Sequence, residues 1–264
     1  ALHIVDIKTK RSKKIPIDLD GVFSASWSPA GKEIVFTGNH NGSSDIYIYD
    51  LDQEKYRQIT DDIFSDSYPS WNNRGDEIVF VSDRGDYVNG EYSGRIEDHD
   101  YRQTDIYILN TKDGIIRRIT DTPDNENHPI WANTEKTIIY TSDHNGVHNL
   151  YKHSIGSHSE SNNESKSDAY AITNVLTGLQ QPTISGDDNS LIFAGYSGTG
   201  WDLYSINKPL EMSSKKILPT HYIKTRDQED LSVEDIRDTD NIDRLDMDDK
   251  GTYSKWIFAQ GYQN

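Results

Sequence analysis

The sequence lacks cysteine, and it also lacks any long apolar run. With no Cys among its 264 residues, neither a disulfide framework nor a Cys-x-x-Cys metal site can form. A membrane-spanning helix needs a run of about 18 apolar residues, and no such run is present. We therefore expect no direct membrane insertion by this segment.

Positive charge is scarce as well. The chain has 27 Lys and Arg against 44 Asp and Glu, which gives a net charge of −17. This excess disfavours a nucleic-acid partner and adsorption to anionic lipid, and it leaves a divalent cation open as a partner. Neither a phosphate-binding loop nor a His-Glu-x-x-His motif is present, so we expect no cofactor.

What the sequence does contain is a repeated module. Its first copy includes SWSPAGKEIVFTGNHNGSSDIYIYDL, residues 26–51, and related copies begin near residues 70, 130 and 183. A Trp column and an Asp column can be followed through the copies, with a basic spacing of 44 residues and longer spacings of 53 and 60. The columns are Trp27, Trp71, Trp131 and Ile184, and Asp45, Asp105, Asn149 and Asp202. Such self-similarity predicts a repeat architecture.

Each repeat contains the pattern of four short strands. The first strand contains the Trp and the second is apolar. The third begins at the Asp column, and the fourth is polar and ends in Ile-Thr. Turns that contain Gly, Asn or Asp separate them. The second strand is apolar at consecutive positions, so both of its faces must be buried. An antiparallel sheet covered on both faces by other sheets is typical of a blade. We therefore predict an all-β fold, a β-propeller of four-stranded antiparallel blades.

The blade count sets the expected domain organisation. Residues 1–17 look like the last two strands of an earlier blade, and residues 18–220 contain four propeller blades. Residues 221–252 read as an acidic linker and residues 253–264 as the start of a further strand or domain. About four full blades plus a partial N-terminal blade indicate part of a larger propeller with N-terminal blades missing. The alternative is a four-bladed ring closed by the terminal segments.

The motifs resemble those of a known family. Trp-Ser-Pro-x-Gly-Lys-x-Ile-x-Phe, then Ser-Asp-x-x-Gly, Asp-Ile-Tyr and a final Ile-Thr are similar to the TolB-type, WD-like propeller repeat over roughly residues 22–220. The third copy has ANTEK in place of the Pro-x-Gly turn, and the fourth has no Trp. The resemblance implies a protein-binding propeller in the periplasm or cell envelope. Related propellers are also attached to serine peptidases or act as oligogalacturonate lyases.

The repeated polar and aromatic columns are interpreted as structural. One carboxylate per blade, always two residues before a Tyr, suits a hydrogen bond to the backbone of the preceding turn. The Trp column suits the core. No Gly-x-Ser-x-Gly elbow is present, so we assign no catalytic residue and expect a non-catalytic module. The structural positions are Trp27, Trp71, Trp131, Asp45, Asp105 and Asp202.

Function should therefore lie where the blades differ. Tyr68, His128 and Gln181 occupy one column, which we expect at the mouth of the central channel. The insertion of residues 87–103 combines Tyr and Arg, residue types enriched in binding hot spots, and we interpret it as a recognition loop. Its candidate residues are Tyr87, Tyr92, Arg95, Tyr101 and Arg102. A second insertion, residues 156–168, is low in complexity and is expected to contribute little.

Three functions stay open on the sequence alone. The first is a non-catalytic scaffold for a protein partner in the bacterial cell envelope. The second is an accessory propeller that gates substrate for a peptidase. The third is a metal-dependent polysaccharide lyase or hydrolase, with histidines as ligands. Against that third alternative, we expect His144 and His148 at the outer rim, away from His128, and we assign no metal ligand.

Overall fold

The computed structural model describes residues 1–88, 94–95, 99–134, 136–155 and 169–226. All of its sheets are antiparallel, and each is formed by strands that are consecutive in the sequence. The expected all-β propeller is confirmed. Tyr92 and most of the acidic tail lie outside the described residues, so the predicted linker and terminal segment stay predictions.

Four sheets form blades 1 to 4, and a hairpin precedes them. The N-terminal hairpin pairs β1 (Leu2–Val5) with β2 (Ser12–Ile15). Blade 1 consists of β3 (Gly21–Trp27), β4 (Glu33–His40), β5 (Ser43–Asp50) and β6 (Lys55–Gln58). Blade 2 consists of β7 (Asp66–Trp71), β8 (Glu77–Ser82), β9 (Asp105–Asn110) and β10 (Ile116–Arg118). Blade 3 consists of β11 (Glu126–Trp131), β12 (Thr137–Ser142), β13 (Asn149–Ser154) and β14 (Tyr170–Ala171).

Blade 4 differs from the others. Within the described residues it has three strands, β15 (Leu179–Ile184), β16 (Ser190–Ser197) and β17 (Gly200–Asn207). After β17 the chain makes a 3-10 turn and runs back to blade 3, where the Lys215 N–H donates to the Ala171 carbonyl at 2.8 Å. It continues into the short helix α1 (His221–Arg226), whose Ile223 is buried. No described segment takes the place of a fourth strand.

The blades pack through the Trp column. The second strands of blades 1 to 3 are buried on both faces, as their sequence predicts. In blade 4 the same expectation is wrong, because β16 has one covered face and Ile192 on its other face is 42% exposed. Trp71 and Trp131 are 6% and 7% exposed, and each packs in a cluster with the second and third strands of the blade before it. Trp27 is 51% exposed. The sheet before it is the N-terminal hairpin alone, which covers the outer half of blade 1 around Phe36 and Tyr47.

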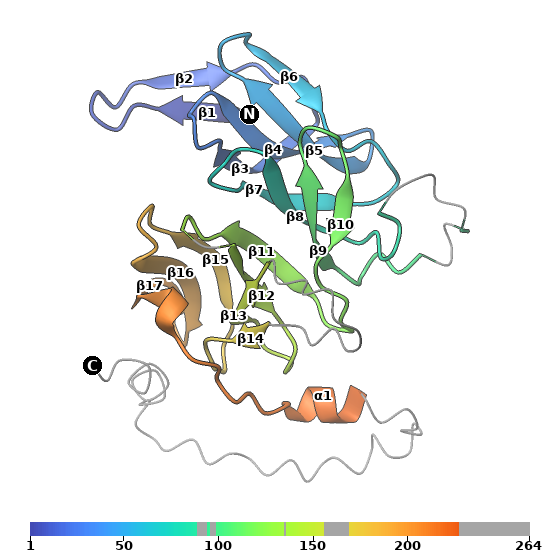
Figure 1. Cartoon of the computed structure of the whole chain (residues 1–264), viewed down its shortest axis with the longest axis vertical. Coiled ribbons are helices and arrows are strands. Elements are labelled where there is room, and N and C mark those ends of the chain that lie inside the picture. Colours follow the sequence, from blue (N-terminus) through green and yellow to red (C-terminus); the bar gives the residue numbers. More distant parts are fainter. Residues whose placement is uncertain (89–93, 96–98, 135, 156–168, 227–264) are drawn as a thin grey trace.

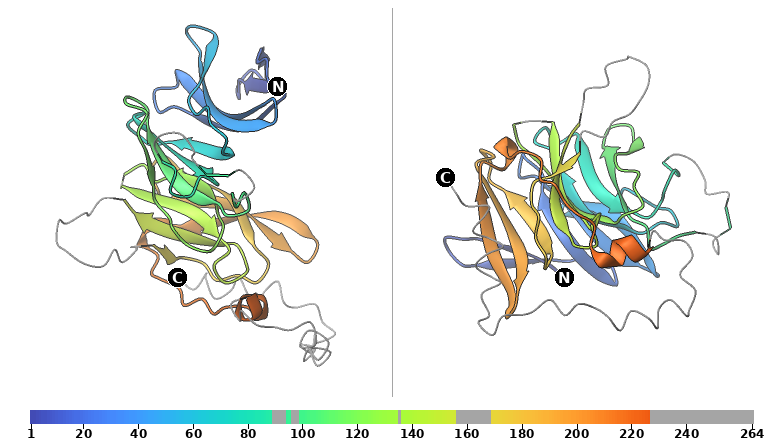
Figure 2. Two further views of the ribbon diagram at one scale, coloured as in Figure 1. Left: turned by 90° about the vertical axis from the view of Figure 1, so that its right-hand side faces the viewer. Right: turned by 90° about the horizontal axis from the view of Figure 1, so that it is seen from below.

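The sheets follow one another in an arc (Figure 1; Figure 2). Blade 1, in blue, and blade 4, in orange, lie at its two ends, and the first strands of successive blades contact each other. Leu203 at the far end is 80% exposed. Because neither Trp27 nor Leu203 is covered, the described sheets do not close into a ring. No described helix is long and apolar enough to cross a membrane.

Candidate functional site

The first strand of every blade carries a β-bulge at the same place. The register of β7 against β8 shifts between Ser67 and Ser70, and β11, β15 and β3 show the same shift. Two residues therefore oppose one residue of the partner strand, which bends the strand and re-aims a side chain. The first bulge residues form what we call the bulge column: Ser24, Tyr68, His128 and Gln181.

All members of the bulge column have a left-handed backbone. Their φ angles are 47° at Ser24 and 52° at Tyr68, His128 and Gln181. Left-handed φ is uncommon for residues other than glycine, and it persists where the surrounding fold enforces it. Because the same conformation recurs at one position of all four blades, the fold itself imposes it.

The sequence contained a signal for these bulges. Pro69, Pro129 and Pro182 follow the column residues in blades 2 to 4. Proline cannot donate to a sheet ladder, so inside a first strand it indicates a bulge. Ser24 carries no such signal, because Ala25 follows it, and the sequence interpretation missed it.

The two aromatic members of the column are in contact. The rings of Tyr68 and His128 lie 4.2 Å apart between centroids, at a tilt of 47°. The His128 Nδ1 lies 3.4 Å from the Thr141 hydroxyl. Burial, together with neighbouring His148, lowers the pKa of His128 to about 4. The imidazole is therefore neutral at physiological pH, and this part of the inner edge offers uncharged aromatic and hydrogen-bonding groups.

The other histidines of blade 3 lie partly where we did not expect them. The His148 carbonyl accepts the Leu179 N–H at 2.9 Å, at the start of β15, so His148 lies at the junction of blades 3 and 4 and not at the outer rim that we expected. His144 is exposed and its Nδ1 lies 2.5 Å from the buried carboxylate of Asp124. Among the residues that the structure describes, no three histidines converge as a histidine metal site requires.

The described part of the first insertion is anchored at both ends. Tyr87 stacks on Phe64 with ring centroids 5.8 Å apart, and the Gln103 side chain donates to the Thr122 carbonyl. Between these anchors, Tyr101 is exposed and the Arg102 guanidinium lies over its ring. The insertion thus presents Tyr101 and Arg102 next to its anchor at Gln103, and Arg95 is exposed as well. The second insertion lies outside the described residues.

The Asp column binds the strand that follows it. Asp105 accepts hydrogen bonds from Thr120, at 3.1 Å, and from Arg118, at 2.6 Å. Asp45 lies 3.5 Å from the Thr60 hydroxyl and accepts a bond from Gln58. These partners belong to the end of the fourth strand, not to the preceding turn that the sequence suggested. The contact locks the outer strand of a blade onto its third strand.

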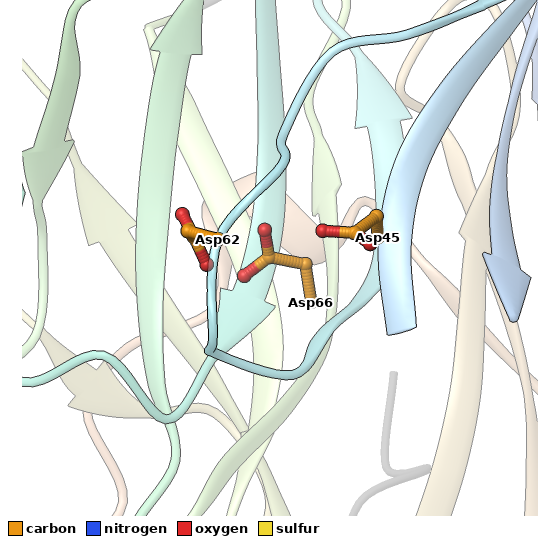
Figure 3. A group of neighbouring side chains, drawn as sticks. All are labelled: Asp45, Asp62 and Asp66. Carbon is orange, nitrogen blue, oxygen red and sulfur yellow. The ribbon is translucent and has the colours of Figure 1, made fainter. Parts of the chain in front are cut away.

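Three carboxylates meet between blades 1 and 2. Asp45, Asp62 and Asp66 each offer an oxygen within 4.8 Å of the others, and Figure 3 shows the three side chains next to one another. Oxygen ligands of this kind suit Ca²⁺ or Mg²⁺. However, the buried guanidinium of Arg84 binds both oxygens of Asp66, at 2.7 and 2.8 Å, and one oxygen of Asp62, at 3.0 Å. An arginine thus already supplies the positive charge.

Burial makes the carboxyl groups of this cluster weaker acids than usual. Burial and the nearby carboxylates raise the pKa of Asp45 to about 7. Burial also raises the pKa of Asp66 to about 6, against the opposing effect of Arg84. Because Arg84 holds the ion pair, we interpret the cluster as an ionic link between the two blades.

The equivalent junction between blades 2 and 3 is also acidic. Glu126 accepts hydrogen bonds from the Thr122 hydroxyl, at 2.8 Å, and from the Ser142 hydroxyl, at 3.2 Å. Burial raises the pKa of Glu126 to about 8. The side chain is therefore largely a neutral acid at neutral pH. Like Asp66 in the first junction, Glu126 lies between two blades, and it bonds to the loop that joins them and to blade 3.

Comparison with known proteins agrees with this architecture. Residues 1–89 match the family described as the TolB beta propeller domain. The fold and the matched residues together define a β-propeller module. Over residues 1–89 the repeats are similar to those of the TolB type. No curated protein sequence matches the chain.

Several solved structures share the fold at low sequence identity. TolB from Acinetobacter baumannii has a TM-score of 0.57 and 18% identity, over 78% of this chain and 45% of that one. An oligogalacturonate lyase in complex with manganese has a TM-score of 0.51 and 12% identity, over 78% and 55%. A puromycin hydrolase mutant has a TM-score of 0.52 and 10% identity, over 78% and 30%. The chain thus spans less than half of that TolB structure.

Proposed function

We propose that this chain is a non-catalytic, TolB-like propeller module that binds a protein partner. The observation that carries the proposal is the bulge column, in which the fold holds Ser24, Tyr68, His128 and Gln181 in a left-handed conformation at one inner position. Backbone strain of this kind concentrates at functional sites. The residues at this position also differ from blade to blade, as a recognition surface requires.

The chemistry of the column favours a protein partner over an ionic ligand. Tyr68 and His128 form a contacting aromatic pair, and Gln181 is exposed. Tyrosine at a held position provides contact area and a directional hydrogen bond at low entropic cost. The insertion adds Tyr101, Arg95 and Arg102 as a second contact surface. We assign the partner to the bacterial periplasm or cell envelope, which the TolB likeness supports.

Two enzymatic settings are second candidates. The similarity to a puromycin hydrolase supports a role as an accessory propeller of a peptidase, in which the arc would gate substrate. The similarity to a manganese-bound oligogalacturonate lyase supports a metal-dependent polysaccharide enzyme. The pair of His128 and His148 is the feature that favours the latter. We rank both below the binding module because the column offers aromatic and hydrogen-bonding groups, among which we assign no nucleophile or general base.

The test compares partner capture by tagged variants from an envelope extract. Tyr68→Ser with His128→Ser introduces the residue that blade 1 already carries at this position, so the backbone conformation is retained. We expect capture of the partner to fall at least about tenfold, a loss of about 1.4 kcal/mol, with an unchanged circular dichroism spectrum. Equal capture by this variant and the intact chain would reject the column as the binding site.

The insertion is tested in the same pull-down. Replacing residues 87–103 by an Asn-Gly turn should also reduce capture about tenfold, while shortening residues 156–168 should leave capture unchanged. The second deletion is the matched control for loop removal. Equal recovery by both deletions would remove the insertion from the binding surface.

A further inference from the structure

Blade 1 lacks part of the cover that blades 2 and 3 have. In blades 2 and 3 the Trp packs against the second and third strands of the blade before it. Trp71, for example, lies in one cluster with Val35 of β4 and Ile48 of β5. Trp27 occupies the same position in blade 1 and is 51% exposed. The sheet before blade 1 therefore leaves Trp27 without its full cover.

The N-terminal hairpin corresponds to the third and fourth strands of a blade. The Asp6 carboxylate accepts the N–H groups of the residues two and three positions later, at 2.9 and 2.7 Å. Asp50 at the end of β5 does the same, at 2.9 and 2.8 Å. The strand β1 therefore matches β5, and Ile4 matches Ile48. Ile4 packs against blade 1, as a third strand does.

The position beside β1 is the second-strand position of this sheet. β1 pairs with β2 from Leu2 to Val5, and the two form a sheet of their own. Its equivalent β5 pairs with β6 on one side and with the second strand β4 on the other. Among the described residues, the sheet before blade 1 thus has its third and fourth strands and no second strand.

A sequence with the pattern of a second strand occurs near the end of the chain. The second strands of blades 1 to 4 contain EIVF, EIVF, TIIY and SLIF, a polar residue followed by two aliphatic residues and an aromatic one. Residues 255–260, KWIFAQ, repeat this order with Trp256 at the first apolar position. In this alignment Ile257 takes the place of Val35, which covers Trp71.

Charge favours the approach of this sequence to the hairpin. Residues 6–14 contain five cations and one acid, and all five cations are exposed. Residues 227–250 contain eleven acids and three cations. Opposite charges attract across the surface over about 8–10 Å at physiological salt. Because the acidic stretch directly precedes residues 255–260, its attraction to the hairpin brings them toward β1.

The chain after α1 is long enough to reach β1. Figure 1 shows α1 and β1 at opposite ends of the arc. The helix ends at Arg226, which leaves 28 residues before Lys255. An extended chain spans about 3.3 Å per residue, so this stretch reaches roughly 90 Å. A compact domain of similar size has a radius of gyration of only about 16 Å.

We propose that residues 255–260 of the same chain bind the edge of β1 opposite β2 as an antiparallel strand. They take the second-strand position of the sheet before blade 1 and cover Trp27. Backbone hydrogen bonds hold the strand at β1, and the burial of its apolar side chains against blade 1 selects its register. The bulge column and the insertion take no part, so this inference and the proposed function stand or fail separately.

The register of the added strand follows from blade 1. There Phe36 of the second strand pairs with Tyr47 of the third. Phe258 matches Phe36 in the alignment of the second strands. His3 matches Tyr47 and therefore lies opposite Phe258. Because side chains alternate between the faces of a strand, the neighbouring Ile257 faces blade 1, whereas Phe258 and His3 face away from it.

Disulfide trapping tests this pairing in the full 264-residue chain. The chain has no cysteine, so a disulfide forms only between two introduced residues. His3→Cys with Phe258→Cys places both sulfur atoms on one face of a paired position, within disulfide reach. The matched control is His3→Cys with Ile257→Cys, whose side chains point to opposite faces. Under mild oxidation we expect the first pair to form an intramolecular disulfide at least about tenfold faster, read by non-reducing electrophoresis.

Hydrogen exchange tests the docking without introduced cysteines. Ile257→Asp places a charge between the added strand and blade 1, which opposes docking. The protection of the amide groups of β1 should therefore fall about tenfold or more. Leu231→Asp makes the same kind of change within the acidic stretch, and it should leave the protection of β1 unchanged. Exchange of β8 should be equal in both variants, which shows that the blades stay folded.

Three results would each overturn the proposal. The first is an equal rate of disulfide formation in the two cysteine pairs. The second is a disulfide that joins two copies of the chain, which would assign the β1 edge to a second copy. The third is unchanged protection of β1 in the Ile257→Asp variant. Loss of folding does not imitate the expected result, because the exchange of β8 reports on the blades in the same experiment.

Discussion

The junction between blades 1 and 2 and the junction between blades 3 and 4 have the same backbone design and opposite chemistry. The first contains Asp45, Asp62 and Asp66 with Arg84. The second has Asn149, Val175 and Leu179 at the positions of the three acids. Asn149 nevertheless accepts the Val175 N–H at 2.8 Å and the Thr173 hydroxyl at 3.1 Å. The hydrogen bonds that join the third and fourth strands are thus made here without any charge.

The comparison shows that the fold needs the hydrogen bonds at a junction and does not need its charges. Leu179 is buried in an apolar cluster, where Asp66 in the first junction requires a guanidinium. Replacing a buried ion pair by apolar groups is often neutral or stabilising, whereas removing one partner alone is costly. The charged junction is therefore vulnerable to single changes that the neutral junction tolerates.

The largest expected effect comes from removing the buried cation. Arg84→Met leaves the Asp66 carboxylate buried without its bidentate partner and should lower the free energy of unfolding by about 3–5 kcal/mol at pH 8. Urea denaturation measures the loss. Adding Asp66→Leu should restore most of the lost free energy of unfolding, because leucine is the residue that blade 4 has at this position.

The matched control is His144, the residue of blade 3 equivalent to Arg84. Its side chain is exposed, so His144→Gln should change the free energy of unfolding by less than about 1 kcal/mol. Equal losses from Arg84→Met and His144→Gln would contradict the special dependence of the first junction on a buried cation.

A smaller effect is expected from pH at the middle junction. The pKa of Glu126 is raised from 4.5 to about 8 by burial, so between these values the folded state binds more protons than the unfolded state. The free energy of unfolding therefore falls as pH rises through this range. The stabilisation from neutral Glu126 is present below about pH 4.5 and lost above about pH 8. Asp45, with its pKa raised to about 7, contributes in the same direction.

Glu126→Gln tests this account. The amide keeps an oxygen for Thr122 and Ser142 and cannot ionise, so the variant should lose about 3 kcal/mol less than the parent between pH 5 and pH 8. Thermal unfolding at both pH values gives the comparison. A variant with the same pH slope as the parent would show that Glu126 does not titrate across this range.

The repeat pattern made most of the fold predictable. Columns of Trp, Asp and Ile-Thr specify local packing that each blade repeats, so strand order and antiparallel pairing follow from one module. The exposure of Trp27 was not predictable in this way, because it depends on which sheet precedes blade 1. The third strand of blade 4 carries the same motif as the others, yet the chain after Asn207 returns to blade 3.

The candidate site was predictable in composition but not in geometry. Sequence comparison placed Tyr68, His128 and Gln181 in one column, and their contact and left-handed backbone came only with the structure. The place of His148 depends on how the loop before β13 packs against β15, where its carbonyl accepts the Leu179 N–H, and residue spacing gives no information on that packing. The hydrogen-bond partners of the Asp column were missed, because the sequence pattern showed the Ile-Thr pair only as the end of a strand.

The central claim is that repeated positions build the blades and that variable positions bind. Asp105→Ala and the Tyr68→Ser, His128→Ser variant should be measured side by side for unfolding free energy and partner capture. We predict that Asp105→Ala loses about 1–3 kcal/mol of stability and keeps capture in its folded fraction, while the bulge variant loses capture and keeps stability. Lost capture with unchanged stability for Asp105→Ala, and unchanged capture for the bulge variant, would contradict the account.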